Sequence, residues 1–285
     1  MDDLSAIQVS EEFEFTDVDF KKIRDLVKKD TGINLSEAKR DMVYARLSRR
    51  LRDLGMQRFS DYLSFLVSGS CEDELIQFTN AITTNLTSFF REEHHFDYLA
   101  TTALPEVVKH NHDQKKIRIW CSAASTGEEP YSIAMVVREM APMLRGWDVK
   151  ILATDLDTNV LDTAKNGIYA ENRIEGISGR RQRKFFLKGT GNHAGKVSVR
   201  NELKELITFK KLNLMDKWPL RGPFDIIFCR NVVIYFTKDT QKVLLDRFAG
   251  LVAPDAYLFM GHSESLNGVT DRFDLIGKTV YRFLG

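Results

Sequence analysis

The stretch CSAASTGEEPYSIA (121–134) follows a short apolar run at 117–120 and leads into an apolar segment with helical spacing. A strand, a loop of small residues and a helix start, in this order, are typical of a site where a ligand lies against the backbone. The loop contains one glycine and ends in Glu128 and Glu129. It lacks the GxGxxG pattern of dinucleotide sites, and its two acids would repel a phosphate group. We therefore interpret it as a loop for a cationic ligand.

Strand-like and helix-like segments alternate after about residue 115. We expect strands at 117–120, 149–154, 207–212, 224–229, 257–261 and 279–284, and helices at 130–141, 157–165 and 237–251. This alternation predicts an α/β fold with a mostly parallel, Rossmann-like sheet. Between 168 and 206 the rhythm breaks, and KFFLKGTGNHAGKVSVR (184–200) predicts two strands joined by a Gly-containing loop.

The N-terminal part has a helical pattern. The first twenty residues are acidic and are expected to form a loose tail. Thr16 is the expected N-cap of a first helix, and a second helix at about 36–54 is expected to stop at Gly55. Further helices are expected at 59–68 and 72–83, and no strand. We expect three parts: a helical domain (1–83), a linker (84–98) and an α/β domain (99–285).

The composition describes an ordinary soluble chain. Its 285 residues carry a net charge of +1, so overall charge indicates no nucleic acid partner. No apolar run approaches 18 residues and no apolar signal segment begins the chain, so we expect no membrane insertion. Three widely spaced cysteines favour a reducing compartment. We expect a cytoplasmic protein.

Polar side chains follow the expected strands, where open α/β sheets bind ligands. Asp155 would accept hydrogen bonds from both hydroxyls of a ribose, although it could also cap the helix at 157–165. Glu128 and Glu129 could likewise be ordinary first-turn acids. Six further candidates follow the later strands: Asn213 and Leu214 for an adenine edge, then Cys229, Arg230, Asn231 and Tyr235.

S-adenosylmethionine suits this combination, because it carries a ribose and an adenine but no phosphate. Its sulfonium and ammonium groups are cations, which a carboxylate at the loop would favour. Glu129 would also gain about 0.3–1 kcal/mol from the helix dipole. The pair His94 and His95 suggests a metal, but adjacent residues on a helix point apart, so we expect no metal site.

Five segments carry a family resemblance: TTNLTSFFRE (83–92), CSAASTGEEPYSIA (121–134), ATDLD (153–157), FDIIFCRNVVIYF (224–236) and GHSES (261–265). Together they resemble the chemotaxis receptor methyltransferases, the CheR family, over essentially the whole chain. The resemblance implies an all-α N-terminal domain followed by a class I methyltransferase sheet with an inserted antiparallel β subdomain at about 174–206. It implies O-methylation of glutamate side chains on the cytoplasmic helices of chemoreceptors. S-adenosylmethionine is the implied cofactor, glutamyl methyl esters are formed, and S-adenosylhomocysteine is left as product.

The resemblance also assigns roles to residues. The implied cofactor site consists of Asn85, Thr87, Arg91, Glu129, Asp155, Asn213, Leu214, Cys229, Arg230 and Asn231. Arg91 and Tyr235 would orient the acceptor and the methyl group, although Arg91 could instead form a linker salt bridge with Glu92, Glu93 or Asp97. The loop GTGNHAG (189–195) resembles that of members whose β insertion docks a C-terminal receptor peptide.

The helix at 36–54 carries basic residues. Lys39, Arg46 and Arg50 are separated by seven and four residues, which places them on one face. Between 36 and 60, seven basic residues oppose three acids. A solvated face is one interpretation; the other is that Lys39, Arg46, Arg49 and Arg50 bind an acidic receptor helix.

Two other functional classes stay open. A methyltransferase acting on nucleic-acid amines typically carries a Pro-Pro-aromatic segment where this chain has CRNVVIY (229–235). A non-catalytic S-adenosylmethionine sensor would not need Arg91 and Tyr235, and both are present. A glutamate carboxylate is already a nucleophile at neutral pH, so receptor methylation would need no general base.

Overall fold

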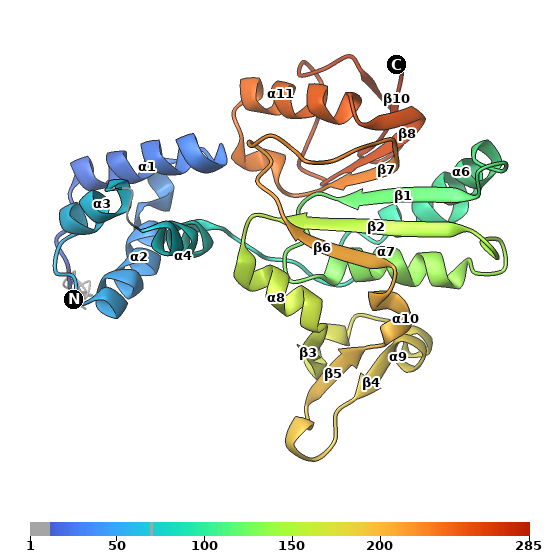
Figure 1. Cartoon of the computed structure of the whole chain (residues 1–285), viewed down its shortest axis with the longest axis horizontal. Helices are drawn as coiled ribbons and strands as arrows, with labels where there is room; N and C mark the ends of the chain where they lie inside the picture. The colour runs from blue at the N-terminus through green and yellow to red at the C-terminus, as the bar shows by residue number, and fades with distance from the viewer. Residues whose placement is uncertain (1–11, 69–70) are drawn as a thin grey trace, which may run out of the picture. The chain divides into compact units, whose positions relative to one another are not determined.

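The computed structural model describes residues 12–68 and 71–285. The chain divides into two compact units, Met1–Thr83 and Thr84–Gly285 (Figure 1). Within the described residues, no helix combines the length and the apolar character needed to cross a bilayer. The predicted combination of an all-α part with an α/β part is confirmed.

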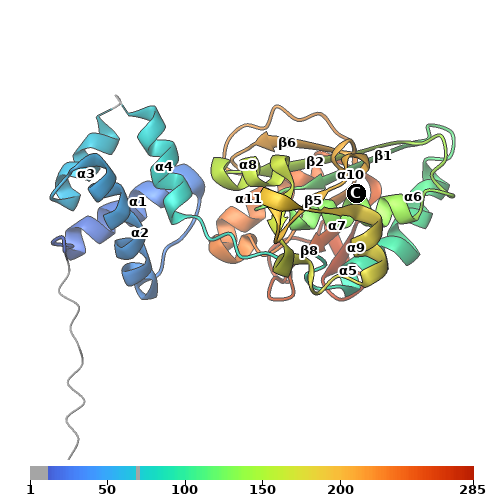
Figure 2. The same cartoon turned by 90° about the horizontal axis from the view of Figure 1, so that it is seen from below.

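In residues 12–68 and 71–83, the first unit is a bundle of four α-helices, α1 (Asp17–Thr31), α2 (Arg40–Leu54), α3 (Phe59–Val67) and α4 (Glu72–Ile82) (Figure 2). Thr16 caps α1 as predicted, in a capping box with Asp19. Gly55 ends α2 as predicted, in the left-handed conformation that a glycine adopts without steric cost. The predicted helix at 36–54 begins with a short 3₁₀ turn, Glu37–Lys39. The described part of this unit contains no strand.

The second unit is built on a seven-stranded sheet in the order β6-β2-β1-β7-β8-β10-β9. Its strands are β1 (Lys116–Cys121), β2 (Asp148–Asp155), β6 (Ile207–Lys211), β7 (Phe224–Cys229), β8 (Val252–Met260), β9 (Phe273–Leu275) and β10 (Val280–Phe283). The first five in sheet order are parallel, and β10 pairs antiparallel with both of its neighbours, β8 and β9. β8 begins before the predicted 257, because Pro254 and Asp255 interrupt its apolar pattern.

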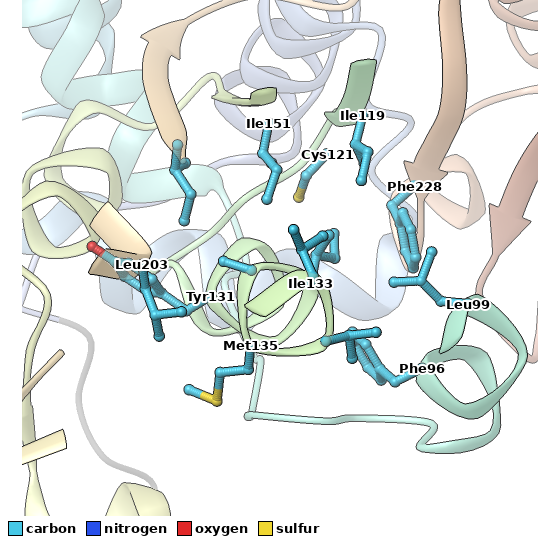
Figure 3. Packing of buried hydrophobic residues seen from close by; sticks show 14 of the residues in the cluster. Phe96, Leu99, Ile119, Cys121, Tyr131, Ile133, Met135, Ile151, Leu203 and Phe228 are labelled. Atoms are coloured by element: carbon cyan, nitrogen blue, oxygen red, sulfur yellow. The ribbon is translucent and has the colours of Figure 1, made fainter. Parts of the chain in front are cut away.

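Helices cover both faces of this sheet. Ile119 and Cys121 of β1 belong to the core on the face of α7 (Glu128–Glu139) (Figure 3). The intervening Trp120 lies on the opposite face, where its ring is 5.2 Å from that of Phe248 in α11 (Lys238–Ala249). The short helices α5 (His94–Tyr98) and α6 (Leu104–His110), joined by a π turn, were not predicted.

The small antiparallel sheet is confirmed, with strand order β3-β5-β4. The two predicted strands are β4 (Phe186–Lys188) and β5 (Lys196–Val199). A third strand, β3 (Ile168–Ala170), was not predicted and follows α8 (Thr158–Asn166) directly. Two short helices, α9 (Gly179–Phe185) and α10 (Asn201–Lys204), complete this small subdomain. Figure 1 shows it projecting away from the larger sheet.

Candidate active site

Backbone hydrogen bonds join the carboxyl ends of four parallel strands. Ser122 N, after β1, donates to Phe228 O at 2.9 Å, and Ala124 N donates to Thr154 O at 2.8 Å. Leu212 N, after β6, donates to Asp155 O at 2.9 Å. The segments that hold the candidate residues are therefore neighbours, as expected for parallel strands that end at one edge of a sheet.

The loop between β1 and α7 has an unusual backbone. Ser125 has φ 49° and Gly127 has φ 100°. A Cβ atom on Gly127 would lie 2.8 Å from both Ala164 Cβ and Tyr169 Oη, so only glycine fits this turn. A positive φ at a non-glycine residue such as Ser125 is strained, and such strain is common at binding sites.

Asp155 binds this loop. Its carboxylate accepts hydrogen bonds from Ser125 N at 2.7 Å and Asp157 N at 3.0 Å, and the residue is 9% exposed. Burial raises the pKa of Asp155 to about 6, although the backbone N–H groups oppose the shift. The alternative that Asp155 caps α8 is wrong, because the cap is Asp157.

The two loop glutamates have different partners, and both are buried. Glu129 accepts hydrogen bonds from Cys121 Sγ at 3.1 Å and from Arg230 at 2.6 Å. Glu128 accepts from Thr126 Oγ1 at 2.6 Å and forms an ion pair with Arg173. Both are first-turn acids of α7, as the alternative held, but each is buried and paired with an arginine. Arg173 balances the charge of Glu128, whereas Glu129 shares Arg230 with Glu92, so this second group of charges keeps a net negative charge that a cation could contact.

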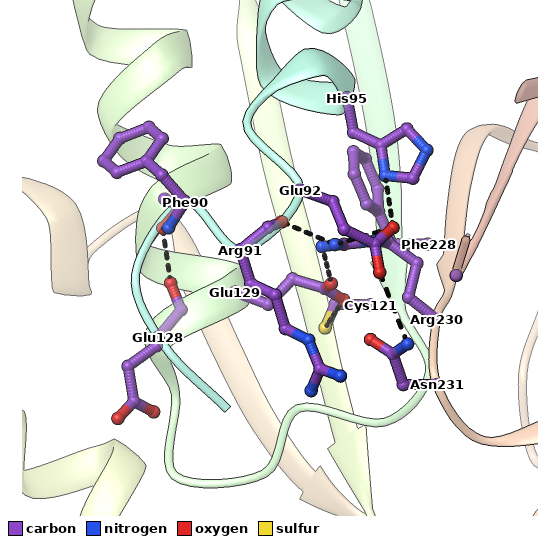
Figure 4. Close-up of polar contacts among 12 residues, drawn as sticks. Phe90, Arg91, Glu92, His95, Cys121, Glu128, Glu129, Phe228, Arg230 and Asn231 are labelled. Carbon is purple, nitrogen blue, oxygen red and sulfur yellow. Dashed lines mark hydrogen bonds and ion pairs between the residues drawn. The ribbon is translucent and has the colours of Figure 1, made fainter. Parts of the chain in front are cut away.

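Arg230 connects the loop to the segment before α5. Its guanidinium lies between the carboxylates of Glu129 and Glu92 (Figure 4), and the ion pair with Glu92 measures 3.3 Å. It also donates to the carbonyl of Arg91 at 2.5 Å. Glu92 was not predicted as a site residue. Burial opposes its ionisation, but the hydrogen bond from His262 and the charge of Arg230 lower its pKa to about 2.

The linker residues lie along the loop between β1 and α7 (residues 122–127), here called the cofactor loop. Asn85 Nδ2 donates to Asp157 Oδ2 at 2.7 Å, and Asn85 O accepts from Ser125 Oγ at 3.0 Å. The carbonyl of Thr87 accepts from Arg173 at 2.9 Å. Their roles toward a cofactor stay predictions, and their backbone positions are fixed by these contacts.

Arg91 donates to the carbonyl of Leu86 at 2.7 Å. It forms no ion pair with any residue in the described ranges, so the predicted alternative of a linker salt bridge is not seen. Tyr235 is half-buried at the end of a 3₁₀ turn, Val233–Tyr235, and its hydroxyl has no hydrogen bond to the described residues.

The remaining candidates follow β6 and β7. Asn213 Oδ1 accepts from Met215 N at 2.9 Å, and the carbonyl of the buried Leu214 accepts from Arg247 at 2.6 Å. Cys229 is the last residue of β7, and burial raises the pKa of its thiol. Asn231 follows with φ 57°, and its Nδ2 donates to Glu92 Oε1 at 3.4 Å.

The expectation that His94 and His95 point apart is wrong, since their ring centroids are 4.2 Å apart. Together with Glu92 they offer three ligand atoms within 4.8 Å of one another. Burial and the charge of Arg230 lower the pKa of His95 to about 4, so it is neutral at pH 7. A cation here would compete with the guanidinium of Arg230 for Glu92. We therefore assign no metal to this cluster.

Two of the four basic candidates in the helical unit have partners within that unit. Arg46 donates to the carbonyl of Thr83 at 2.7 Å and to that of Ile82 at 2.9 Å. Arg50 forms a bidentate pair with the buried Glu74, at 3.0 and 2.6 Å. Lys39 and Arg49 are exposed. The predicted basic face is therefore partly a packing surface against α4.

Known proteins resemble the chain in both units. Residues 85–282 match the family described as "CheR methyltransferase, SAM binding domain", and residues 18–83 match "CheR methyltransferase, all-alpha domain". The chain is 45% identical over 277 residues to the chemotaxis protein methyltransferase of Salmonella typhimurium, covering 96% of this chain and 93% of that protein.

Two further relatives are equally similar. Chemotaxis protein methyltransferase 2 of Pseudomonas aeruginosa is 45% identical over 280 residues, with 97% of each chain covered. The chemotaxis protein methyltransferase of Escherichia coli is 45% identical over 277 residues, with 96% of this chain and 94% of that protein covered.

Proposed function

The chain belongs to the CheR methyltransferase family, and we propose that it transfers methyl groups from S-adenosylmethionine to glutamate side chains of chemoreceptors, forming glutamyl methyl esters. Methylation with S-adenosylmethionine in chemotaxis follows from the family and the relatives. The glutamate acceptor rests on one observation. Arg91, next to Glu92 and the cofactor loop, forms no ion pair within the described residues, so its guanidinium is available to a carboxylate.

The strand-end residues suit this cofactor. The Asp155 carboxylate has lone pairs beyond those that accept Ser125 N and Asp157 N, so it would accept the ribose hydroxyls. Arg230 Nε is a buried donor without a partner among the described residues, and a ligand carboxylate would accept from it. Asn213 and Leu214 would border the adenine. When bound, the cofactor supplies a methyl group on a positively charged sulfur.

The residues of the chain need only position the acceptor. A glutamate with a pKa of about 4.3 is ionised at pH 7 and is itself the nucleophile. Arg91 would hold that carboxylate in a charge-assisted pair, and Tyr235 would orient it toward the methyl group. Exclusion of water and alignment of the reacting atoms would supply most of the rate enhancement.

Receptor capture is assigned to the helical unit. Lys39 and Arg49 are exposed, and an acidic receptor helix is their electrostatic complement. Arg46 and Arg50 would contribute less, because their guanidinium groups already bind carbonyls and Glu74. We place the protein in the cytoplasm, which suits its three free thiols.

A C-terminal receptor peptide would bind the small subdomain. β4 is an edge strand of its sheet, with β5 as its neighbour. The hydrogen bonds from Gly189 N to Lys196 O and from Arg200 N to Phe185 O direct the N–H group of Lys188 away from β5, while that of Phe186 donates to Gln182 O in α9. An extended peptide would add along this edge.

Incubation with methyl-labelled S-adenosylmethionine and receptor-bearing membranes tests the proposed function. We expect label on the receptor that is released by base as methanol, since methyl esters are base-labile. A receptor whose cytoplasmic glutamates are replaced by alanine is the matched control and should stay unlabelled. Base-stable label on nucleic acid would indicate the amine methyltransferase instead. Cofactor binding without label on any acceptor would indicate a sensor.

A further inference from the structure

Glu264 is a buried acid in the loop that follows β8, and it is 3% exposed. Its Oε2 accepts hydrogen bonds from Gly261 N at 2.6 Å and from Asn231 N at 2.8 Å. Its Oε1 accepts from Val232 N at 2.8 Å and from Ile234 N at 3.3 Å. One carboxylate thus binds four backbone donors, three of which belong to the segment after β7.

A carboxylate is the side chain that suits this position. Its two oxygens offer about four lone-pair sites and no donor, which matches four converging N–H groups. A glutamine would turn an NH₂ group toward two of those donors. The four hydrogen bonds offset part of the cost of burying the charge, and burial still raises the pKa of Glu264.

Glu264 determines the path of residues 230–236, here called the catalytic loop. Asn231 adopts φ 57° in this loop, a left-handed conformation that is uncommon outside glycine and that asparagine tolerates better than most residues. The close approach extends to Gly261, where a Cβ atom would lie 2.5 Å from Asn231 Nδ2 and 2.8 Å from Glu264 Oε2. The glycine and the glutamate therefore act together to hold the loop in place. The four hydrogen bonds of Glu264 and this close contact at Gly261 are called the seat of the loop below.

The two functional side chains of the catalytic loop depend on this seat to different degrees. Arg230 is also held by its ion pairs with Glu129 and Glu92. Tyr235 has no hydrogen bond from its hydroxyl to the described residues, so its position depends on the backbone. Removal of the seat should therefore displace Tyr235 more than Arg230.

We propose that Glu264 is a positioning residue that seats the catalytic loop through four backbone hydrogen bonds and so places Tyr235 for methyl transfer. The proposal rests on the proposed function for its activity readout, and the seat itself has an independent readout in amide hydrogen exchange.

The test compares Glu264→Gln with Asp225→Asn. Asp225 is a second buried acid that accepts a backbone N–H, from Arg118 at 2.7 Å, and it lies near the opposite end of β7 from Cys229. Because a misplacement of about 1 Å costs about 100-fold in rate, Glu264→Gln should lower kcat by about that factor. The dissociation constant of S-adenosylhomocysteine should change by less than about tenfold, since Arg230 keeps two partners. Asp225→Asn should leave kcat within about threefold of the parent.

Gly261→Ala is a second variant, which disturbs the seat without removing the charge, and it should show the same split between kcat and binding. Glu264→Gln with the kcat of the parent would overturn the proposal. Equal losses of kcat and of affinity in Glu264→Gln and Asp225→Asn would also overturn the proposal, because such a pattern indicates a general folding defect. If the parent methylates no receptor, the proposed function fails and amide exchange decides the inference. Faster exchange of the amides of residues 231, 232, 234 and 261 in Glu264→Gln alone supports the seat, and unchanged protection refutes it.

Discussion

Arg230 and Glu129 form a buried ion pair of 2.6 Å that joins the end of β7 to the start of α7. The guanidinium also lies 3.3 Å from Glu92, so one cation balances two acids. Removal of one partner of a buried pair leaves a charge without compensation, which costs more than the pair contributes when intact.

Arg230→Met should therefore lower the free energy of unfolding by about 3–5 kcal/mol. Lys242→Met is the control, because Lys242 pairs with Asp246 at 3.0 Å on the surface, and its loss should cost less than about 1 kcal/mol. Urea unfolding of both variants measures the difference. Equal urea midpoints for the two variants would mean that the charge of Arg230 is not needed to compensate the buried acids.

Asp155 should make cofactor binding dependent on pH. Its pKa is raised from 3.8 to about 6 in the free protein, and ribose hydroxyls favour the ionised form. Affinity should be highest above pH 6 and fall by up to about tenfold per pH unit below it. Without cofactor the sign is opposite: the raised pKa stabilises the folded chain below about pH 4, and this contribution is lost as the pH rises through 6.

Calorimetry of S-adenosylhomocysteine binding between pH 5 and 8 measures this effect. Asp155→Asn should weaken binding by about 1.5–3 kcal/mol per charged hydrogen bond lost and remove the pH dependence. Asp148→Asn, at the other end of β2, should keep both the affinity and the pH profile of the parent. If the affinity of Asp155→Asn still depends on pH in the same way, the titrating group is another residue.

Tyr235→Phe should lower turnover while leaving cofactor affinity unchanged. The substitution removes only a hydroxyl that has no hydrogen bond to the described residues, so folding should not suffer. Tyr98→Phe removes another half-buried phenolic hydroxyl of the same unit and should be silent. Steady-state kinetics with receptor membranes measures both. Turnover equal to that of the parent would exclude a catalytic role for the hydroxyl.

Reversal of the exposed basic residues, Lys39→Glu with Arg49→Glu, should slow receptor methylation sharply, and most at low salt. Exposed charges are screened within about 8 Å at physiological ionic strength, so salt should reduce the difference from the parent. Lys28→Glu with Lys29→Glu makes the same change of charge at exposed positions of α1 and should have little effect. Similar slowing by both pairs would indicate net charge rather than a binding face.

Arg50→Glu should act through folding instead. It would place a second acid beside the buried Glu74, which Arg50 now binds at 2.6 Å. We expect a loss of about 3–5 kcal/mol in the stability of the helical unit. Circular dichroism during thermal unfolding measures this loss. An unchanged melting temperature would return Arg50 to the candidate binding residues.

Lys188→Pro should slow methylation of receptors that carry a C-terminal tail and leave a tailless receptor unaffected. The substitution removes an N–H that points away from β5, so the sheet keeps its own hydrogen bonds. Lys188→Ala keeps that N–H but removes the side chain, which pairs with Glu171. A comparison of the two variants therefore distinguishes the effect of the backbone N–H from that of the side chain. Slowing of both receptors by Lys188→Pro would point to a folding defect.

The predictable part of the fold comes from local patterns. Short and mostly apolar runs predicted β1, β2 and β7, because strands buried on both faces are rich in apolar residues. The segment 94–110 was missed because three short helical pieces share its apolar residues. β9 has three residues, Phe273–Leu275, too few to show an alternation.

The candidate site divides in the same way. Topology predicted that Asp155 and Arg230 lie at one edge of the sheet, because strand ends can be read from the sequence. Glu92 and Glu264 were missed as site residues although both lie in segments that carry the family resemblance, since their roles arise from tertiary contacts. Helical spacing placed Arg46 and Arg50 on a face, but it could not show that α4 packs against them.

Arg173 lies in the small subdomain, yet both of its partners belong to the framework around the cofactor loop. It pairs with the fully buried Glu128 and donates to the carbonyl of Thr87. An exchange of this subdomain between family members would therefore also change contacts outside the subdomain. A chimera that omits the arginine would leave a buried acid without its counter-ion next to the loop at 121–129. A chimera of two family members should therefore take Glu128 and Arg173 from the same parent protein.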